Sequence, residues 1–130
     1  MIAADTSTWI AFLQGERGED TDLLDQALGN KQVVMVPVVL TELLSDPQLD
    51  PEVRRVLAEL PLVETRDGFW LRATTLRSEV LSKRRKARLG DALIAQFCVD
   101  HDIPLVTRDR DFLAFAESAD LNVVVGPRTH

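Results

Sequence analysis

The sequence lacks several features that would define whole classes of protein. A single cysteine, Cys98, excludes an internal disulfide and a zinc site built from several cysteines. No apolar run is long enough to cross a membrane, because even the run at 33–40 is short and is interrupted by Pro37. Asp5 interrupts the first apolar stretch before the apolar region of a signal peptide could form. We therefore expect a cytoplasmic protein without a membrane segment.

Histidine and positive charge are also in short supply. The two histidines, His101 and His130, fall at a predicted helix end and at the C-terminus, which disfavours chemistry based on a histidine pair. The sequence has 15 Lys and Arg residues and 21 Asp and Glu residues, which gives a net charge of −6. This balance argues against non-specific nucleic-acid binding by the whole surface. It leaves room for a local basic patch and for a group of acids that a cation could neutralise.

Short apolar segments alternate along the chain with longer amphipathic ones. We predict buried strands at residues 2–4, 33–36, 62–64, 105–107 and 122–125. We predict helices at residues 6–13, 21–28, 37–46, 51–60, 67–86, 91–101 and 109–117, with Thr21 as an N-cap and Gly90 as a break. Such alternation indicates an α/β fold, a three-layer α/β/α sandwich with a mostly parallel central sheet. No repeat or linker divides the chain, so we expect one domain over residues 1–130.

Acidic residues follow the predicted strands. Asp5 ends the first strand, and Asp109 and Asp111 follow the strand at 105–107. Glu42 lies roughly 8 Å beyond Pro37 on the helix after the second strand, at about 1.5 Å per residue. In open parallel sheets, ligands bind beyond the carboxyl ends of the strands. These acids should therefore meet at one edge of the sheet, and Asp91 joins them if its helix begins at the same edge.

Each acid alone has an ordinary structural explanation. Asp5 and Asp109 suit helix N-caps, Asp91 suits a first helical turn, and Glu42 suits a solvated helix face. Gathered in a partly dry cleft, however, they would repel one another strongly. A divalent cation explains the gathering, because hard carboxylate oxygens suit Mg²⁺ or Mn²⁺.

Four stretches carry a resemblance to a known family. They are, in chain order, IAADTS (2–7), VVLTELL (38–44), GDALIA (90–95) and LVTRDRDF (105–112). Taken in this order and spacing, over nearly the whole chain, the sequence resembles the PIN-domain nucleases, and most closely the VapC toxins of bacterial toxin–antitoxin pairs. Many relatives continue the third stretch with small residues where this chain has Gln96 and Phe97. We interpret that departure as a packing difference.

The resemblance implies a magnesium-dependent endoribonuclease that hydrolyses RNA phosphodiester bonds with a metal-activated water. It implies Mg²⁺, with Mn²⁺ as a substitute, and a cognate antitoxin protein as partner. We also expect a homodimer. The resemblance assigns the catalytic and metal-binding acids to Asp5, Glu42, Asp91 and Asp109, with Asp111 as a further metal-binding candidate. Ser7 and Thr107 match hydroxyl positions that support the acids.

One dense basic run leads directly to Asp91, and two arginines flank Asp109. The run adjoins the predicted site in an otherwise acidic protein, so we expect it to hold an RNA backbone. The alternative is a solvated helix face. The predicted RNA contacts are Lys83, Arg84, Arg85, Lys86, Arg88, Arg108 and Arg110. Buried packing is the interpretation we favour for Trp9 and Trp70 over base stacking.

Other acidic α/β sites fit the sequence less well. A haloacid-dehalogenase-type phosphatase needs a second Asp two residues after the first, where this chain has Ser7. A response-regulator receiver needs a lysine after a late strand, and none follows Lys86. A Toprim-type site would use Asp109 and Asp111 but leave Asp5 and Asp91 without a role. The remaining alternative is a PIN-like module that binds RNA or protein without cutting, against which the intact acids argue.

Overall fold

The computed structural model describes residues 1–126, so His130 lies outside the described residues. Seven helices and three strands occur in these residues. In chain order they are β1 (Ala3–Ala4), α1 (Thr6–Leu13), α2 (Glu19–Gly29), α3 (Pro37–Leu44), α4 (Pro51–Glu59), α5 (Phe69–Ser82), α6 (Leu89–Asp100), β2 (Leu105–Thr107), α7 (Phe112–Ser118) and β3 (Val123–Val125).

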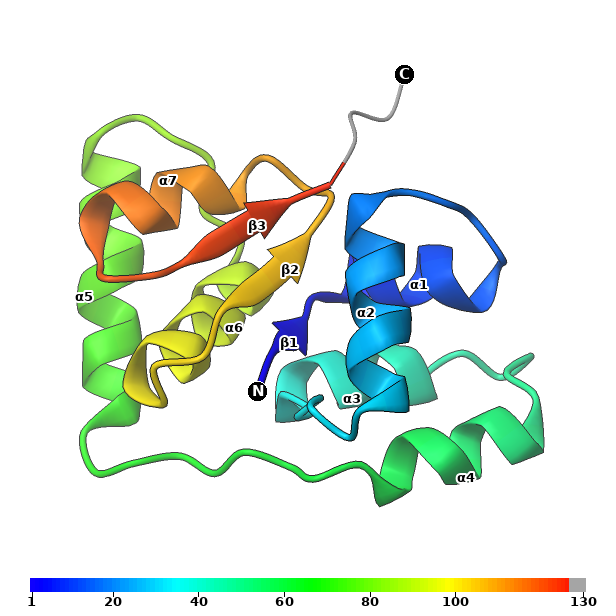
Figure 1. The fold of residues 1–130 in the computed structure, drawn as a ribbon. Coiled ribbons are helices and arrows are strands. Elements are labelled where there is room, and N and C mark those ends of the chain that lie inside the picture. The colour runs from blue at the N-terminus through cyan, green and yellow to red at the C-terminus, as the bar shows by residue number, and fades with distance from the viewer. Residues whose placement is uncertain (127–130) are drawn as a thin grey trace.

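The sheet has the order β1-β2-β3 and is parallel throughout. Ala4 pairs with Val106, and Thr107 pairs with Val125. Figure 1 shows the sheet between the helix pair α1–α2 and the helix pair α5–α6, with α7 beside β3. Because all strands run the same way, Asp5, after β1, and Asp109, shortly after β2, emerge at the same edge.

Local signals explain where the site-bearing helices begin. The carboxylate of Asp5 caps α1 by accepting a hydrogen bond from the Thr8 N–H at 3.1 Å. Pro37 occupies the first turn of α3, where its missing N–H costs nothing. Asp91 lies in the first turn of α6, where the helix dipole favours an acid. Asp5 and Asp91 thus lie at the N-terminal ends of α1 and α6, whereas Glu42 lies in the last turn of α3.

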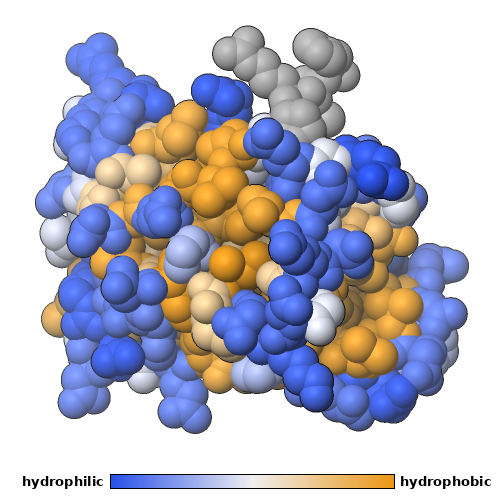
Figure 2. All heavy atoms as spheres, viewed as in Figure 1, coloured by the Kyte–Doolittle hydropathy of each residue, from blue (hydrophilic) through white to orange (hydrophobic). Residues whose placement is uncertain are grey.

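The core is aliphatic and aromatic and lies on both sides of the sheet. Its largest buried side chains include Trp9, Phe69, Phe112 and Phe115, each at most 2% exposed. The space-filling view shows apolar side chains that remain at the surface between polar ones (Figure 2). No helix among residues 1–126 is long and apolar enough to span a membrane.

Several predicted boundaries are wrong, for identifiable reasons. The predicted strands at 33–36 and 62–64 do not form as strands. Each makes only isolated bridges: Val33 pairs with Ile2, and Met35 pairs with Leu62. Gly90 lies inside α6 instead of breaking a helix, and Thr21 lies within α2 because the helix already begins at Glu19. The long helix ends at Ser82, so the basic run is a loop.

The adjacent aromatics Phe69 and Trp70 provide a test of this core. Phe69 is 1% exposed and stacks on Phe97 with ring centroids 4.3 Å apart, whereas Trp70 is 63% exposed. We expect Phe69→Ala to lower the free energy of unfolding by about 3–5 kcal/mol, because it leaves a cavity. Trp70→Ala should change it by less than about 1 kcal/mol. Urea denaturation followed by circular dichroism measures both, and equal losses would contradict the described packing.

Candidate active site

Asp5 is the most deeply buried of the four predicted acids, with 4% of its surface exposed. Its carboxylate accepts hydrogen bonds from the Ser7 hydroxyl at 2.9 Å and from the Thr8 N–H at 3.1 Å. Burial raises the pKa of Asp5, and hydrogen bonds from Ser7, Thr8 and Thr107 oppose that rise only in part. The charge of Asp109 raises it further. Asp5 is therefore a buried acid whose negative charge is held by a dedicated set of donors.

Glu42 reaches the site from α3. Its Oε1 accepts a hydrogen bond from the Thr6 hydroxyl at 2.8 Å, and Thr6 directly follows Asp5. The side chain is exposed, so it can meet solvent or a ligand while tethered to the start of α1. The bond brings residues 36 positions apart in the chain to the same edge.

The pKa of Asp91 responds to the charges of the other three acids. Burial raises its pKa to about 6, and the negative charges of Asp109, Asp5 and Glu42 act in the same direction. Arg88 opposes the rise. A carboxylate is repelled in this way only by charges that lie close to it, so the four acids share one electrostatic field.

Asp109 and Asp111 occupy the loop between β2 and α7. The Asp109 N–H donates to the Thr107 hydroxyl at 2.9 Å, and the Asp111 N–H donates to Asp109 Oδ1 at 2.9 Å. Thr107 is fully buried and its hydroxyl also bonds to Asp5, so it joins two of the acids. Asp111 instead pairs with Lys86, at 3.6 Å. The geometry favours Asp109 over Asp111 as the fourth member of the group.

The donor set fits a hydrated divalent cation. Among residues 1–126, no three His, Cys, Asp or Glu side chains lie close enough together to ligate one metal ion directly. Mg²⁺, however, keeps several waters and is usually bound through one or two carboxylates. Four acids gathered at one edge of the sheet offer that combination of charge and space.

Basic residues lie beside the loop that carries Asp109 and Asp111, where Lys86 pairs with Asp111. A cavity of about 370 Å³ is lined by Arg85, Lys86, Arg110 and Asp111. Arg85 pairs with Glu117 at 3.1 Å, and the Lys83 ammonium donates to the Ser118 hydroxyl at 2.9 Å. These pairs hold the segment 83–88 against α7. Arg84 and Arg88 are exposed in the same segment, and the positive charge of Arg88 lowers the pKa of the Asp91 carboxyl.

Arg108 is not available as the sequence suggested. Its side chain is only 11% exposed, and its guanidinium forms a two-pronged ion pair with Asp20, at 2.8 and 3.0 Å. The prediction of an RNA contact at Arg108 is therefore corrected, because the group that would bind phosphate is already bound to a buried acid. Asp20 was missed altogether. Within the sequence it looks like any acid in a first helical turn.

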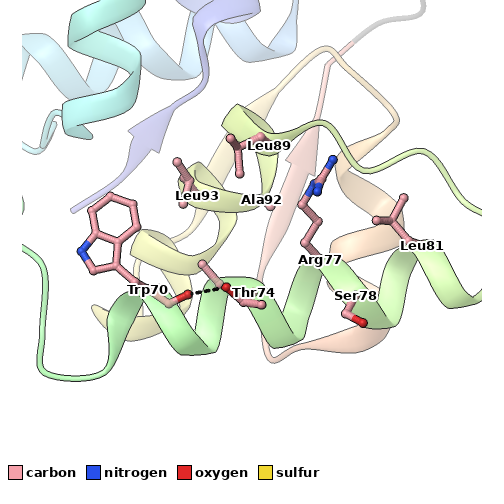
Figure 3. Close-up of a pocket in the computed structure, with 9 residues that line it drawn as sticks. Trp70, Thr74, Arg77, Ser78, Leu81, Leu89, Ala92 and Leu93 are labelled. Atoms are coloured by element: carbon pink, nitrogen blue, oxygen red, sulfur yellow. Dashed lines mark hydrogen bonds between the residues drawn. The ribbon is translucent and has the colours of Figure 1, made fainter.

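The prediction that Trp70 packs in the core is wrong, because its side chain is exposed. It lines a cavity of about 460 Å³ between α5 and α6 with Leu81, Leu89 and Leu93 (Figure 3). Arg77 is the one charged side chain among that cavity's lining residues, so the cavity has no metal-binding acid. Trp9 is buried as predicted.

The other polar candidates have structural roles. His101 places one ring nitrogen 3.4 Å from Arg66 and the other 2.7 Å from the Glu64 carbonyl oxygen. Cys98 is buried, and burial together with the nearby Asp5 charge raises the pKa of its thiol to about 12. A thiol that stays protonated is a poor nucleophile. The Cys98 thiol is therefore a poor candidate for a nucleophile.

With the fold and these acids established, the chain belongs to the PIN domain family, whose profile matches residues 2–118. The resemblance drawn from the four sequence stretches is confirmed at this level. The chain is similar to Ribonuclease VapC5 of Mycobacterium tuberculosis, with 27% identity over 132 residues that cover 92% of this chain and 91% of that protein.

Solved structures agree with the family. VapBC2 from Rickettsia felis, bound to a DNA fragment from its promoter, matches with a TM-score of 0.74 and 19% identity, covering 98% of this chain and 100% of that chain. VapBC-5 from Mycobacterium tuberculosis, a member of the VapBC family of toxin–antitoxin systems, matches with a TM-score of 0.69 and 21% identity, covering 95% and 97%. These matches confirm the predicted α/β/α sandwich with a parallel sheet.

The raised pKa of Asp91 gives a measurable pH dependence. The folded carboxyl, with a pKa of about 6, holds its proton where the unfolded one, at 3.8, has lost it. The folded state is therefore favoured at low pH, and this contribution is lost as the pH rises through about 6. We expect Asp91→Asn to raise the urea midpoint of metal-free protein more at pH 7.5 than at pH 4.5.

Carbon-detected NMR of the Asp91 carboxyl measures the pKa itself, and Asp109→Asn should lower it by removing a nearby negative charge. Asp25→Asn, at an exposed position of α2, is the matched control for removal of a charge. An Asp91 pKa that Asp109→Asn leaves unchanged would show that the two acids do not share a site.

Proposed function

We propose that this protein is a Mg²⁺-dependent endoribonuclease and the toxin component of a toxin–antitoxin pair. The observation that carries the proposal is the convergence of Asp5, Glu42, Asp91 and Asp109 on one sheet edge, where burial, with the charges of the other three acids, raises the pKa of Asp91 to about 6. The relative named Ribonuclease VapC5 and the similar VapBC complexes support the assignment. Mn²⁺ would replace Mg²⁺, because it accepts the same oxygen ligands.

The side chains of this site would have different roles in catalysis. Asp5 and Asp91 would hold the cation, and Glu42 and Asp109 would complete its surroundings or accept a proton from water. When bound, a divalent cation lowers the pKa of water and polarises the phosphoryl oxygen. Ser7 and Thr107 keep the Asp5 carboxylate oriented through their hydrogen bonds, and Thr6 does the same for Glu42.

The basic segment 83–88 and Arg110 would hold the RNA backbone beside the acids. Phosphate contacts fix the register of a nucleic acid without reading its sequence. The cavity lined by Arg85, Lys86 and Arg110 opens next to Asp111, two residues after Asp109. A backbone bound there would bring a neighbouring phosphodiester to the acids.

An antitoxin and a second copy of this chain are the proposed protein partners. Apolar side chains at the surface supply area for both, since Ile10 and Leu13 of α1 are 44% and 37% exposed, and Trp70 and Leu89 are 63% and 60% exposed. The similar VapBC structures contain a toxin and its antitoxin. Buried Trp9 and Leu43, by contrast, belong to the core.

Cleavage of a mixed RNA panel by purified, antitoxin-free protein tests the function. We expect cutting with Mg²⁺ or Mn²⁺ and none with EDTA. Asp5→Asn and Asp91→Asn should each reduce the rate by more than the roughly 10–100-fold typical of outer-shell partners, because they remove the ligands themselves. Asp25→Asn should cut as the parent does.

Two results would overturn this function. Cleavage that persists in EDTA, or in both Asn variants, would remove the metal site from the mechanism. Absence of cleavage under every condition, with the variants binding RNA as tightly as the parent, would identify a binding module instead.

The role of the basic residues is tested by their salt dependence. Arg84→Gln and Arg110→Gln should each weaken binding of catalytically inactive Asp91→Asn protein to single-stranded RNA. Each should also reduce the slope of log affinity against log salt by about 0.7 if it contacts one phosphate. Lys31→Gln is the control, because Lys31 adjoins Gln32, which bonds to Ile2 at the opposite end of β1. Equal effects of all three changes would indicate diffuse attraction only.

A further inference from the structure

Asp20 is a fully buried carboxylate outside the group of four acids. It accepts hydrogen bonds from Arg108 Nε at 2.8 Å and Nη2 at 3.0 Å, and from the Thr8 hydroxyl at 2.9 Å. Burial alone would raise the pKa of Asp20, but these bonds, with the Thr21 N–H and the Arg108 charge, lower it overall. Asp20 is therefore a buried anion with a full set of partners.

Both partners of Asp20 lead directly to acids of the active site. Thr8 binds Asp20 through its hydroxyl and donates its N–H to Asp5 Oδ1 at 3.1 Å. Arg108 lies between Thr107, whose hydroxyl bonds to Asp5 and accepts the Asp109 N–H, and Asp109 itself. One carboxylate thus ties together the start of α1 and the loop after β2, which present Asp5 and Asp109.

The surroundings of Asp20 hold it in a single position. Gly126, at the end of β3, donates its N–H to the Thr107 carbonyl oxygen at 2.6 Å. A Cβ on Gly126 would come within 2.6 Å of the Asp20 carboxylate, so no larger residue fits there. Arg108 also faces Glu16 at 3.6 Å. Strand, helix and loop therefore close around the Asp20–Arg108 pair.

Stability alone explains this pair poorly. Desolvation of two charges offsets much of their attraction, and well-packed apolar residues often replace a buried ion pair without loss of stability. What apolar residues cannot supply is a fixed, two-pronged geometry that sets the direction of a loop. The Asp20–Arg108 pair has that geometry, and its partners contact or adjoin Asp5 and Asp109.

We propose that Asp20 is a positioning residue of the active site, which acts through Thr8 and Arg108 to hold Asp5 and Asp109 in place for the metal. This role rests on the proposed nuclease function. Outer-shell partners of this kind typically change metal affinity or activity by about 10–100-fold. We expect Asp20→Asn to raise the Mg²⁺ dissociation constant and lower kcat within that range, while KM for RNA changes by less than about twofold, because the basic segment is untouched.

The chain offers a matched control in Arg72 and Asp100. This pair is also two-pronged, at 3.0 and 2.6 Å, and the Asp100 side chain is only 7% exposed. It joins α5 to the C-terminal end of α6, nine residues from Asp91 and roughly 13 Å along the helix axis. Asp100→Asn should destabilise the protein comparably yet leave Mg²⁺ affinity and kcat as in the parent.

Isothermal titration with Mg²⁺, kinetics on a cleaved RNA and thermal unfolding would be measured for the parent, Asp20→Asn, Arg108→Lys and Asp100→Asn. Arg108→Lys should fall between parent and Asp20→Asn, because lysine keeps the charge but loses the second prong. If Asp20→Asn does not fold, Thr8→Val serves in its place, since it keeps the shape and removes one bond to Asp20.

The outcomes separate the two proposals. A parent that binds no Mg²⁺ and cuts no RNA would refute the proposed function itself. A parent that does both, with Asp20→Asn or its substitute indistinguishable from it, would refute the positioning role alone. Equal losses in Asp20→Asn and Asp100→Asn would also refute it, because they would reflect only general destabilisation.

Discussion

Repulsion among the gathered carboxylates is the constraint on which the rest of this structure depends. Two like charges roughly 6 Å apart cost about 3 kcal/mol at an effective dielectric constant near 20. The protein offsets this cost with local donors: Ser7, Thr8 and Thr107 for Asp5, and Thr6 for Glu42. Asp91 lacks such a set among the described bonds, and burial, together with the charges of Asp109, Asp5 and Glu42, raises its pKa to about 6. The unrelieved part of the repulsion is what a cation would remove.

The fold makes this gathering possible at low entropic cost. Parallel strands end at a common edge, so the acids that follow β1 and β2 meet without long loops. The helices α1 and α6 add their N-terminal ends, whose dipoles favour negative charge. Behind the acids, the Asp20–Arg108 pair connects α2 with the loop after β2. The site is held by elements from both halves of the chain.

The sequence predicted the parts of the site that depend on local chemistry. Asp5 and Asp109 follow short apolar strands, so topology predicted that they meet at one edge. Asp91 was expected there only if its helix begins at that edge, and the family resemblance supplied the roles of the acids. Glu42 followed from the position of Pro37 and the length of a helical turn. The overall α/β/α arrangement followed from the alternation of strands and helices.

The parts that the sequence did not predict depend on long-range partners. Asp20 and Arg108 are 88 residues apart, and no local pattern distinguishes a buried ion pair from two surface charges. Trp70 looks like a core aromatic, but Phe69 occupies the buried position beside it. Residues 33–36 have the composition of a strand and pair only at single bridges, because pairing is decided by neighbours elsewhere in the chain.

We propose that the four acids, which come from separate elements, form one cation site. Titration of metal-free protein with Mn²⁺, followed by paramagnetic broadening of assigned amide resonances, tests it most directly. We expect the amides of Asp5, Glu42, Asp91 and Asp109 to broaden together at the lowest Mn²⁺ concentration. Broadening that begins instead at the exposed acids Glu19, Asp22 and Asp25 of α2, or that spreads evenly over the acidic surface, would contradict it.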